Sequence, residues 1–388
     1  GMDLESGIPY RQVKPWFYAA VTAIGAAALY FIWISNVSPI VADTLYKQGY
    51  NLSSANQWPQ AVPLLKEALS WASNEDYYEL YLGQAYLQLA TTESQKASTD
   101  KTALANMQAY LGASERELLR ANQLAPLNPD HYANLARLYT RWADLEPARS
   151  TEMLNKAIGR YLQDVNTYAP RNARLWAELA ATQASLATNR TDTDITGGSF
   201  DQAAMDKAIE YGQKSVAIDP KYDFNRLVLG DIYRFAGKKD EAGQQYLALA
   251  EIDPLQLASD ERYTRRIMDV GLSNLVNLED VQKAFDPAQY DKKDTDATKR
   301  NQDKAFVLGA QGAVYLYKGQ LDKAQSTLNE SIGMDATSPY VHAFLSVVYK
   351  KLGAAAQQNN EASTARSLAK NQSNPAAVQQ AIETLLAS

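Results

Sequence analysis

Residues 224–254 read FNRLVLGDIYRFAGKKDEAGQQYLALAEIDP, and this stretch decides the fold. It predicts two antiparallel helices, because Gly237 permits a turn in the middle and Pro254 stops the second helix. Gly230 and Ala242 are small where the two helices are expected to cross closely. The larger side chains expected to fill the space around the crossing are Leu229, Tyr233 and Tyr246.

The same spacing returns along the chain, and six further stretches carry it. A period of roughly 34 residues with this pattern resembles the tetratricopeptide repeat (TPR), a helix pair that stacks into solenoids. The resemblance implies an all-α fold, a TPR-type helical-hairpin solenoid, over residues 42–388. The positions that carry it are Gly49, Ala61 and Leu65 in the first unit, Leu82, Gly83 and Tyr86 in the second, Leu135, Ala136 and Tyr139 in the third, Leu179, Ala180 and Ala208 in the fourth, Gly312, Tyr315 and Ala324 in the sixth, and Tyr340, Leu345 and Tyr349 in the seventh.

Three stretches depart from the repeat pattern. Polar residues at 91–105 and 187–201 predict insertions between the two helices of the second and fourth units. Residues 255–302 predict one irregular helix pair and a charged linker that ends in DKKDTDATKRNQDK. We therefore expect about five repeats over residues 38–254, and further repeats with a final capping helix over residues 303–388.

Residues 16–37 predict a transmembrane helix. Residues 16–34 read WFYAAVTAIGAAALYFIWI, and as a helix they rise about 28 Å, close to the hydrocarbon thickness of a bilayer. Aromatic residues stand at both ends of the run, as in the aromatic belts of spanning helices. A buried soluble helix and a cleaved signal peptide are the alternatives. The signal peptide is disfavoured because the apolar run is too long and no A-x-A site follows it cleanly.

The charges beside this helix predict its orientation. Arg11 and Lys14 precede it, and no charge follows until Asp43. The positive-inside rule then makes residues 1–15 a cytoplasmic segment and places the array outside a bacterial cell membrane that the chain crosses once. The initial Gly1-Met2 fits either a tag remnant or an internal segment of a longer precursor.

Small residues line one face of the predicted span. Ala19, Ala23 and Ala27 recur at four-residue spacing, which lets helices approach closely in lipid. We expect a helix–helix contact on this face, although alanine is also simply common in such spans.

Composition argues against several classes of function. The net charge is −6 and the acidic and basic residues are interspersed, so no basic face for nucleic acid is expected. The chain has no cysteine, and its two histidines, His131 and His342, lie far apart. The sequence has no phosphate-binding glycine loop, no G-x-S-x-G elbow and no H-E-x-x-H motif. We predict no catalytic residue, no metal site and no cofactor, and therefore no enzyme.

One polar stretch resembles a calcium loop. In RTDTDITGGSFD, the residues Asp192, Asp194, Gly197 and Asp201 offer a D-x-D-x-x-G opening. The twelfth position of such a loop is Ala203 rather than the glutamate that binds calcium through two oxygens. The sequence therefore favours a flexible, turn-rich loop.

The first helix of each TPR pair is expected to line a concave groove for a partner. Aromatic and arginine side chains anchor partners in such grooves. The alternative for each position is an ordinary solvated or packed inner face. The lysine and asparagine set with which chaperone-type TPR domains hold a C-terminal carboxylate is not present at these positions. The candidate groove residues are Tyr46, Tyr50, Tyr77, Gln84, Arg137, Arg141, Asp231, Arg234, Phe306 and Tyr317.

A span followed directly by residues 41–90 of the first repeats resembles the C-terminal part of bacterial O-antigen ligase/polymerase-like membrane proteins. The catalytic groups of that family belong to a multi-span part, so the resemblance implies no catalytic residue here. We predict a membrane-anchored scaffold that binds protein partners, including a membrane protein. The alternative is an accessory extracytoplasmic domain of a polysaccharide ligase or polymerase system, with a glycan as partner. A cytosol-facing adaptor would require the opposite topology.

Overall fold

The computed structural model describes residues 15–188, 200–252, 286–290, 296–372 and 375–387, and these residues form helices and no strand. The fold is an all-α solenoid of helical hairpins of the TPR type, as predicted. The chain divides into two compact units, Gly1–Leu145 and Glu146–Ser388.

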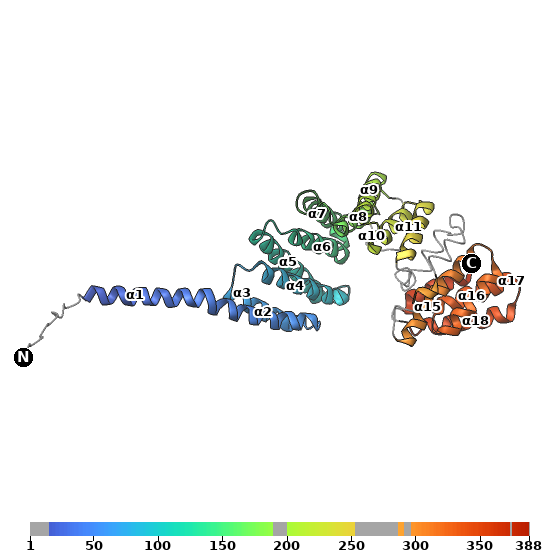
Figure 1. Ribbon diagram of the computed structural model, residues 1–388, viewed down its shortest axis with the longest axis horizontal. Coiled ribbons are helices and arrows are strands. Elements are labelled where there is room, and N and C mark those ends of the chain that lie inside the picture. The colour runs from blue at the N-terminus through green and yellow to red at the C-terminus, as the bar shows by residue number, and fades with distance from the viewer. Residues whose placement is uncertain (1–14, 189–199, 253–285, 291–295, 373–374, 388) are drawn as a thin grey trace, which may run out of the picture. The chain divides into compact units, whose positions relative to one another are not determined.

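The first unit opens with one long helix (Figure 1). Helix α1 (Pro15–Ile32) runs through a π-helical turn, η1 (Trp33–Val37), straight into α2 (Ser38–Ser54), the first helix of the first hairpin. Helix α2 pairs with α3, α4 pairs with α5, and α6 packs on α5 and α4. These later helices are α3 (Trp58–Trp71), α4 (Asp76–Ala97), α5 (Lys101–Leu124) and α6 (Pro129–Leu145).

The second unit repeats the hairpin. Helix α8 pairs with α9, α10 with α11, α15 with α16 and α17 with α18, while α19 packs on α17 and α18. Its elements are η2 (Pro147–Arg149), α7 (Ser150–Gln163), η3 (Asp164–Tyr168), α8 (Ala173–Thr188), α9 (Gln202–Ile218), α10 (Asp223–Phe235), α11 (Lys239–Ile252), η4 (Pro287–Tyr290), α15 (Ala297–Tyr317), α16 (Leu321–Met334), α17 (Pro339–Leu352), α18 (Ala355–Ala369) and α19 (Pro375–Ala387).

The hairpin of α10 and α11 shows why small residues are required at the crossing. A Cβ atom on Gly230 would lie 2.5 Å from Cε1 of Tyr246, closer than atoms can approach. Tyr246 is buried, and its hydroxyl donates a hydrogen bond of 2.5 Å to Oδ1 of Asp231. Gly237 makes the turn with a φ of +73°, a value that side chains other than glycine rarely adopt. The predicted helix stop at Pro254 lies outside the described residues.

Other hairpins also have a glycine where their two helices cross. A Cβ atom on Gly83 would lie 2.8 Å from Cγ of Leu118, and one on Gly312 would lie 2.6 Å from Cγ of Leu328. In each pair a glycine on the first helix faces a large buried side chain on the second. The close crossing is therefore a property of the repeat and occurs in both units.

The polar insertion predicted at residues 91–105 is wrong. Helix α4 continues to Ala97 and α5 begins at Lys101, so only a short turn separates them. The hydroxyls of Thr91 and Thr92 donate to the carbonyls of Leu87 and Gln88 within the helix, and Asp100 accepts hydrogen bonds from two amides at the start of α5. Most of the second predicted insertion, residues 189–199, lies outside the described residues.

The charged linker predicted to reach residue 302 ends earlier. Helix α15 already begins at Ala297, and the Asp296 carboxylate accepts hydrogen bonds from the amides of Thr298 and Lys299. An aspartate at this position satisfies amides that would otherwise be unpaired, so a helix can start inside a charged run. Residues 255–285 and 291–295 of that predicted segment lie outside the described part of the chain.

A carboxyl group is buried inside the α4–α5 hairpin. Glu79 is 7% exposed, and its Oε2 atom has no hydrogen-bond partner. Burial raises the pKa of Glu79 to about 7. A hydrogen bond to Glu117 and the charge of Glu117 act in the same direction, while Arg120 opposes them. The hairpin therefore favours Glu79 in its protonated form.

The close approach of Tyr246 to Gly230 predicts that a larger side chain at residue 230 destabilises the hairpin. Gly230→Leu should lower the free energy of unfolding by about 1–3 kcal/mol through overpacking against Tyr246. Chemical denaturation followed by circular dichroism measures the change. Gly159→Ala is the matched control, because a Cβ there meets no atom within 4 Å, and it should be neutral or stabilise by about 0.5–1 kcal/mol. Equal stability of Gly230→Leu and the parent chain would show that the crossing lies elsewhere.

Glu79 predicts a pH dependence of stability. Its pKa in the folded chain, about 7, lies above the ordinary value of 4.5, so the folded state binds this proton more tightly. Its contribution is complete below pH 4.5 and is lost as the pH rises through 7. Glu79→Gln should therefore melt at a higher temperature than the parent at about pH 8 and near the parent at about pH 4.5. Glu75 is exposed and lies beside the same helix, so Glu75→Gln is the control and should melt at the same temperature as the parent at both pH values.

Candidate partner-binding face

Five tyrosines gather where α2 and α4 lie side by side in the first unit. The ring centre of Tyr46 is 4.8 Å from that of Tyr78, in a stacked arrangement, and 5.4 Å from that of Tyr81. Tyr50 also meets Tyr81 edge to face at 5.3 Å, and Tyr77 stacks on Tyr81 at 6.3 Å. We call these five residues the tyrosine cluster. Aromatic pairs of this kind add stability beyond the area that they bury.

The cluster has a packed base and an exposed top. Tyr78 is buried, whereas Tyr50 is 42% exposed and Tyr77 is 51% exposed. Burial raises the pKa of Tyr46 well above its ordinary value, and the neighbouring tyrosines add to the effect. Burial likewise raises the pKa of Tyr78. The phenol of Tyr46 therefore stays neutral, while the rings of Tyr50 and Tyr77 remain exposed at the top of the cluster.

The same face continues from α4 onto α6. Nε2 of Gln84 lies 3.4 Å from Oδ1 of Asn134 across the two helices. Arg137 and Arg141 follow Asn134 by three and seven residues, so they share its side of α6. Nη1 of Arg141 is 3.7 Å from the carboxylate of Asp144. We call the tyrosine cluster together with Gln84, Asn134, Arg137 and Arg141 the partner face.

Two predicted groove residues of the second unit serve the packing of their own hairpin. Asp231 accepts the hydroxyl of Tyr246, and Nε of Arg234 lies 3.8 Å from its Oδ1. The Arg234 side chain is only 5% exposed and lies over the ring of Phe235 at 4.9 Å. Asp231 therefore links α11 to α10, Arg234 packs along α10, and the two side chains offer little free surface.

The remaining two groove residues also lie in the second unit. Phe306 is 36% exposed on α15. The ring of Tyr317 meets that of Phe344 edge to face at 6.5 Å. The first unit thus brings six of the ten predicted residues onto one face, and the other four belong to other hairpins.

Three members of the partner face were missed from the sequence: Tyr78, Tyr81 and Asn134. The run YYELY at residues 77–81 carried a signal, because Tyr77 and Tyr81 are four residues apart and share one side of a helix. Tyr78 lies on a different side and enters the cluster only through its contact with Tyr46.

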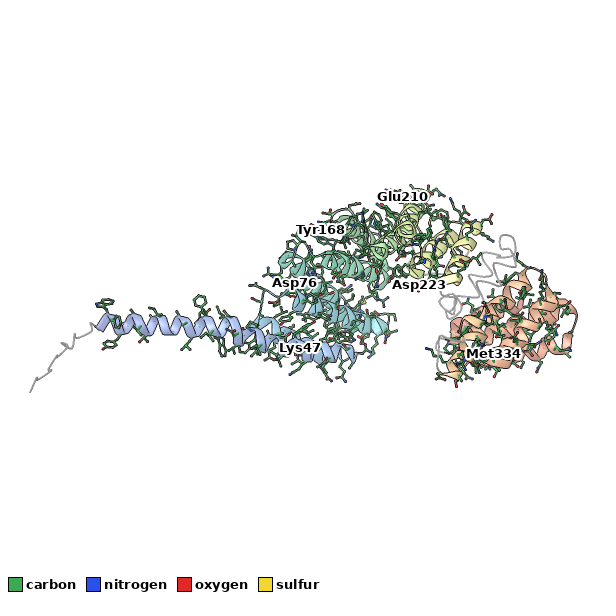
Figure 2. All side chains as sticks on the ribbon, viewed as in Figure 1. Lys47, Asp76, Tyr168, Glu210, Asp223 and Met334 are labelled. Atoms are coloured by element: carbon green, nitrogen blue, oxygen red, sulfur yellow. The ribbon has the colours of Figure 1, made fainter. Side chains whose placement is uncertain are left out.

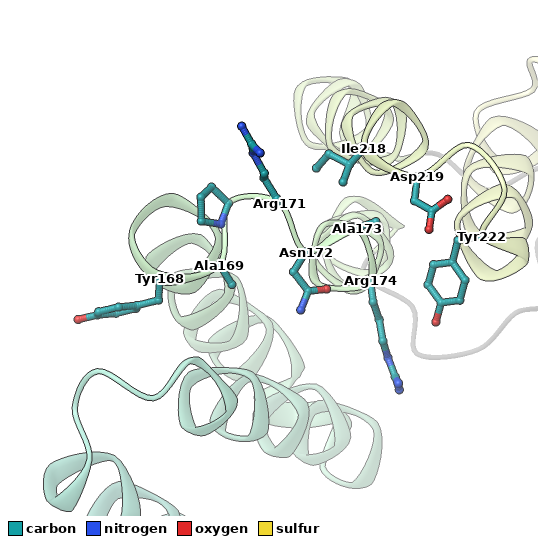
Figure 3. Close-up of a pocket in the computed structure, with 10 residues that line it drawn as sticks. Tyr168, Ala169, Arg171, Asn172, Ala173, Arg174, Ile218, Asp219 and Tyr222 are labelled. Carbon is teal, nitrogen blue, oxygen red and sulfur yellow. The ribbon is translucent and has the colours of Figure 1, made fainter.

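A shallow pocket of about 830 Å³ lies in the second unit, at the beginning of α8 (Figure 3). Tyr168 and Tyr222 stand at its two ends, with Arg171 and Asn172 between them. Nε of Arg174, which also lines the pocket, donates to Glu178 at 2.8 Å. The pocket therefore combines aromatic rings with planar polar groups.

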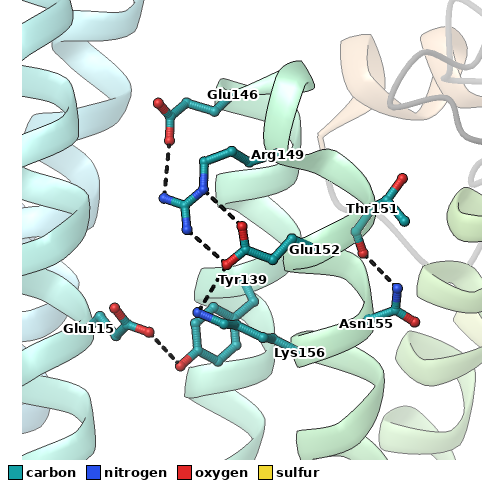
Figure 4. A network of polar contacts seen from close by, with 8 residues as sticks. All are labelled: Glu115, Tyr139, Glu146, Arg149, Thr151, Glu152, Asn155 and Lys156. Atoms are coloured by element: carbon teal, nitrogen blue, oxygen red, sulfur yellow. Dashed lines mark hydrogen bonds and ion pairs between the residues drawn. The ribbon is translucent and has the colours of Figure 1, made fainter.

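Ion pairs and hydrogen bonds tie neighbouring turns and helices together inside each unit (Figure 4). In the second unit, Oε1 of Glu152 is 2.9 Å from Nη2 of Arg149 and 3.5 Å from Nζ of Lys156. Hydrogen bonding from Arg149 lowers the pKa of Glu152. In the first unit, the hydroxyl of Tyr139 donates to Glu115 at 2.8 Å. The Glu152 contacts thus lie within the second unit, and the Tyr139–Glu115 hydrogen bond joins α6 to α5 within the first.

The histidines and the calcium-like loop give no metal site in the described residues. Nε2 of His131 lies 2.7 Å from Asp76, and Nδ1 of His342 lies 2.6 Å from Glu361, one carboxylate each. No group of three or more possible ligands occurs in the part of the chain that the structure describes. The calcium-like residues Asp192, Asp194 and Gly197 lie outside it, and Asp201 caps α9.

Comparison with solved structures found tetratricopeptide repeat proteins and an assembly chaperone. A tetratricopeptide repeat protein from Parabacteroides merdae ATCC 43184 is 13% identical over 77% of this chain and 99% of its own, with a TM-score of 0.36. The assembly chaperone of RpL4 (Acl4, residues 1–338) is 11% identical over 83% and 99%, with a TM-score of 0.36. A thermophilic TPR protein of Thermus thermophilus, TTC0263, is 18% identical over 66% and 100%, with a TM-score of 0.29.

At these identities and TM-scores the likeness adds nothing to the fold already described. No family model and no curated protein matches the sequence. What the partner face binds therefore has to be inferred from its own chemistry.

Proposed function

We propose that the protein is a membrane-anchored scaffold that binds an extended protein segment on its partner face. The observation that carries this proposal is the pair of exposed tyrosines, Tyr50 and Tyr77, held in place by the tyrosine cluster beneath them. Rigid aromatic rings bury much area at little cost in conformational entropy, which suits them to binding a partner.

The partner face also favours a particular kind of segment. Its α2–α4 end carries flat rings and hydroxyl groups, and its α6 end carries the guanidinium groups of Arg137 and of Arg141, which also pairs with Asp144. Aromatic rings suit proline and other apolar residues, and guanidinium groups suit carboxylates. The proposed partner segment is therefore extended, apolar at one end and acidic at the other.

The anchor is proposed from the long first helix. Trp16–Ser54 is one continuous helix of 39 residues, and its most apolar window has a mean hydropathy of 1.8 with none of it buried. By length and composition this helix can cross a membrane. Its side chains stand clear of the hairpins along most of α1 (Figure 2). Ala19, Ala23 and Ala27 are available there to meet a helix of a membrane protein partner.

The proposed topology follows the charges that flank the span. Arg11 and Lys14 keep the N-terminal segment in the cytoplasm, so the array stands outside a bacterial cell membrane. The tether then raises the effective concentration of the partner face for segments of proteins in the same membrane.

A second candidate function is that of an accessory domain in a polysaccharide ligase or polymerase system. The pocket between Tyr168 and Tyr222 favours it, because aromatic rings beside arginine and asparagine groups could stack on and hydrogen-bond a sugar.

The topology can be tested with single cysteines, because the chain has none of its own. Thr99→Cys, in the exposed α4–α5 turn, should react with a membrane-impermeant maleimide added to intact bacterial spheroplasts. Ser6→Cys, on the other side of the span, should react only after the membrane is opened. The reverse pattern would show that the array faces the cytoplasm.

The partner face can be tested with a photo-crosslinking amino acid at Tyr50 or Tyr77. In cells, both positions should crosslink the same protein, and Arg137→Glu with Arg141→Glu should reduce the yield at least several-fold. Glu67, exposed on α3, is the matched control position and should give no such product. Equal yields from Tyr77 and Glu67 would contradict the proposal, and a glycan-sized product would favour the second candidate.

A further inference from the structure

We infer that one rim of the first unit rests on the lipid surface of the membrane that anchors it. The rim consists of the α3–α4 connection (residues 72–75) and the α5–α6 connection (residues 125–128), together with Ile40 and Trp71; we call it the membrane rim. The inference depends on the proposed anchor and extends it, because it assigns a second contact with lipid outside the spanning helix.

The proposed span and the first hairpin are not separated by a linker. Helix α1 becomes α2 through the π-helical turn of η1. At that turn the ring of Trp33 lies 6.0 Å from the ring of Trp71, and Oγ of Ser38 donates to the carbonyl oxygen of Trp71. The C-terminal end of α3 is therefore fixed beside the point where the apolar helix ends, and with it the start of the α3–α4 connection.

The order of the helices places both rim connections at the same side of the first unit. Each hairpin reverses the chain, so α2, α4 and α6 begin at the same rim, and α4 contacts both α2 and α6. The connections that lead into α4 and α6 therefore lie at the rim where α1 enters. The α4–α5 turn lies at the opposite rim.

The membrane rim exposes large apolar side chains. Leu127 is 78% exposed and Ile40 is 67% exposed, and Leu127 has the highest exposure of the large apolar side chains that the structure describes. Among residues 71–75 and 125–129, Glu75 is the one charged residue. The opposite turn, by contrast, is flanked by Lys96, Asp100 and Lys101. Exposed apolar groups beside tryptophans suit the interface between lipid and water.

The acidic residues near the rim do not prevent this contact. Glu75 ends the α3–α4 connection, and Asp76 and Asp130 lie in the first turns of α4 and α6. Oδ2 of Asp76 lies 2.7 Å from Nε2 of His131. In the proposed contact these carboxylates would face the lipid headgroups and water.

The contact would also set the height of the partner face. Tyr46 follows Ile34 on the same helix by a rise of about 18 Å. With the rim seated on lipid, the tyrosine cluster would be held close to the membrane. It would then reach segments that emerge directly from the bilayer.

The inference can be tested with fluorescent labels on single cysteines in the full chain. The chain is reconstituted in vesicles of phosphatidylcholine with a minority of phosphatidylglycerol, with or without lipids that carry a quenching nitroxide. Labels at Leu127→Cys and Ser73→Cys, one in each rim connection, should be quenched at least several-fold more than a label at Leu104→Cys. Leu104 is the matched control, an exposed leucine near the opposite rim.

A label at Ala23→Cys separates the two possible failures. Strong quenching there with rim labels no more quenched than Leu104 would overturn the membrane rim and leave the anchor intact. Absence of quenching at Ala23 would overturn the anchor and the rim together. The inference requires quenching at both rim positions, and quenching at only one of them would also overturn it, because a dye can enter lipid on its own.

Discussion

The close crossing of paired helices is the constraint on which the rest of the structure depends. A glycine on the first helix lets a large side chain of the second helix approach the backbone, as Gly230 does for Tyr246 and Gly83 for Leu118. Because the two helices of a hairpin lie close together, the next hairpin can stack directly against the pair. First helices of successive hairpins then become neighbours, which no single hairpin could achieve.

That neighbourhood creates the partner face. Tyr46 and Tyr50 come from one hairpin, and Tyr77, Tyr78 and Tyr81 come from the next. Only the stacking of α2 beside α4 brings the rings of the first hairpin within 4.8–5.4 Å of those of the second. The base of the cluster is packed between the two hairpins, and its top is exposed and carries the proposed partner contact. The buried Glu79 lies on another side of α4, against α5, and belongs to the packing of that hairpin.

The continuity of α1 with α2 gives the first hairpin a special position. In a protein with a flexible linker, the array could turn freely with respect to its anchor. Here the helix that is proposed to cross the membrane is also the first wall of the solenoid, and the Trp33–Trp71 contact braces the junction. The orientation of the proposed anchor therefore also sets that of Tyr46 and Tyr50, which lie on the same continuous helix.

The sequence alone determined the hairpin repeat, because glycine, alanine and aromatic spacing directly reports which side chains meet inside one pair of helices. It also determined the apolar helix at residues 16–34, since hydropathy needs no partner to be recognised. It did not determine the lengths of α4 and α5, because the polar residues at 91–97 bond back to their own helix and look like a loop only in composition.

The roles of polar and aromatic side chains were decided by tertiary structure. Spacing placed Asp231 and Arg234 on an inner face, but Tyr246 from the facing helix engages Asp231 and the pair is largely buried. Spacing equally placed Tyr50 and Tyr77 there, and no other helix that the structure describes covers their exposed sides. Whether such a side chain is buried or exposed depends on residues that are distant in sequence. Only the packed hairpins could therefore distinguish the buried Asp231 and Arg234 from the exposed Tyr50 and Tyr77.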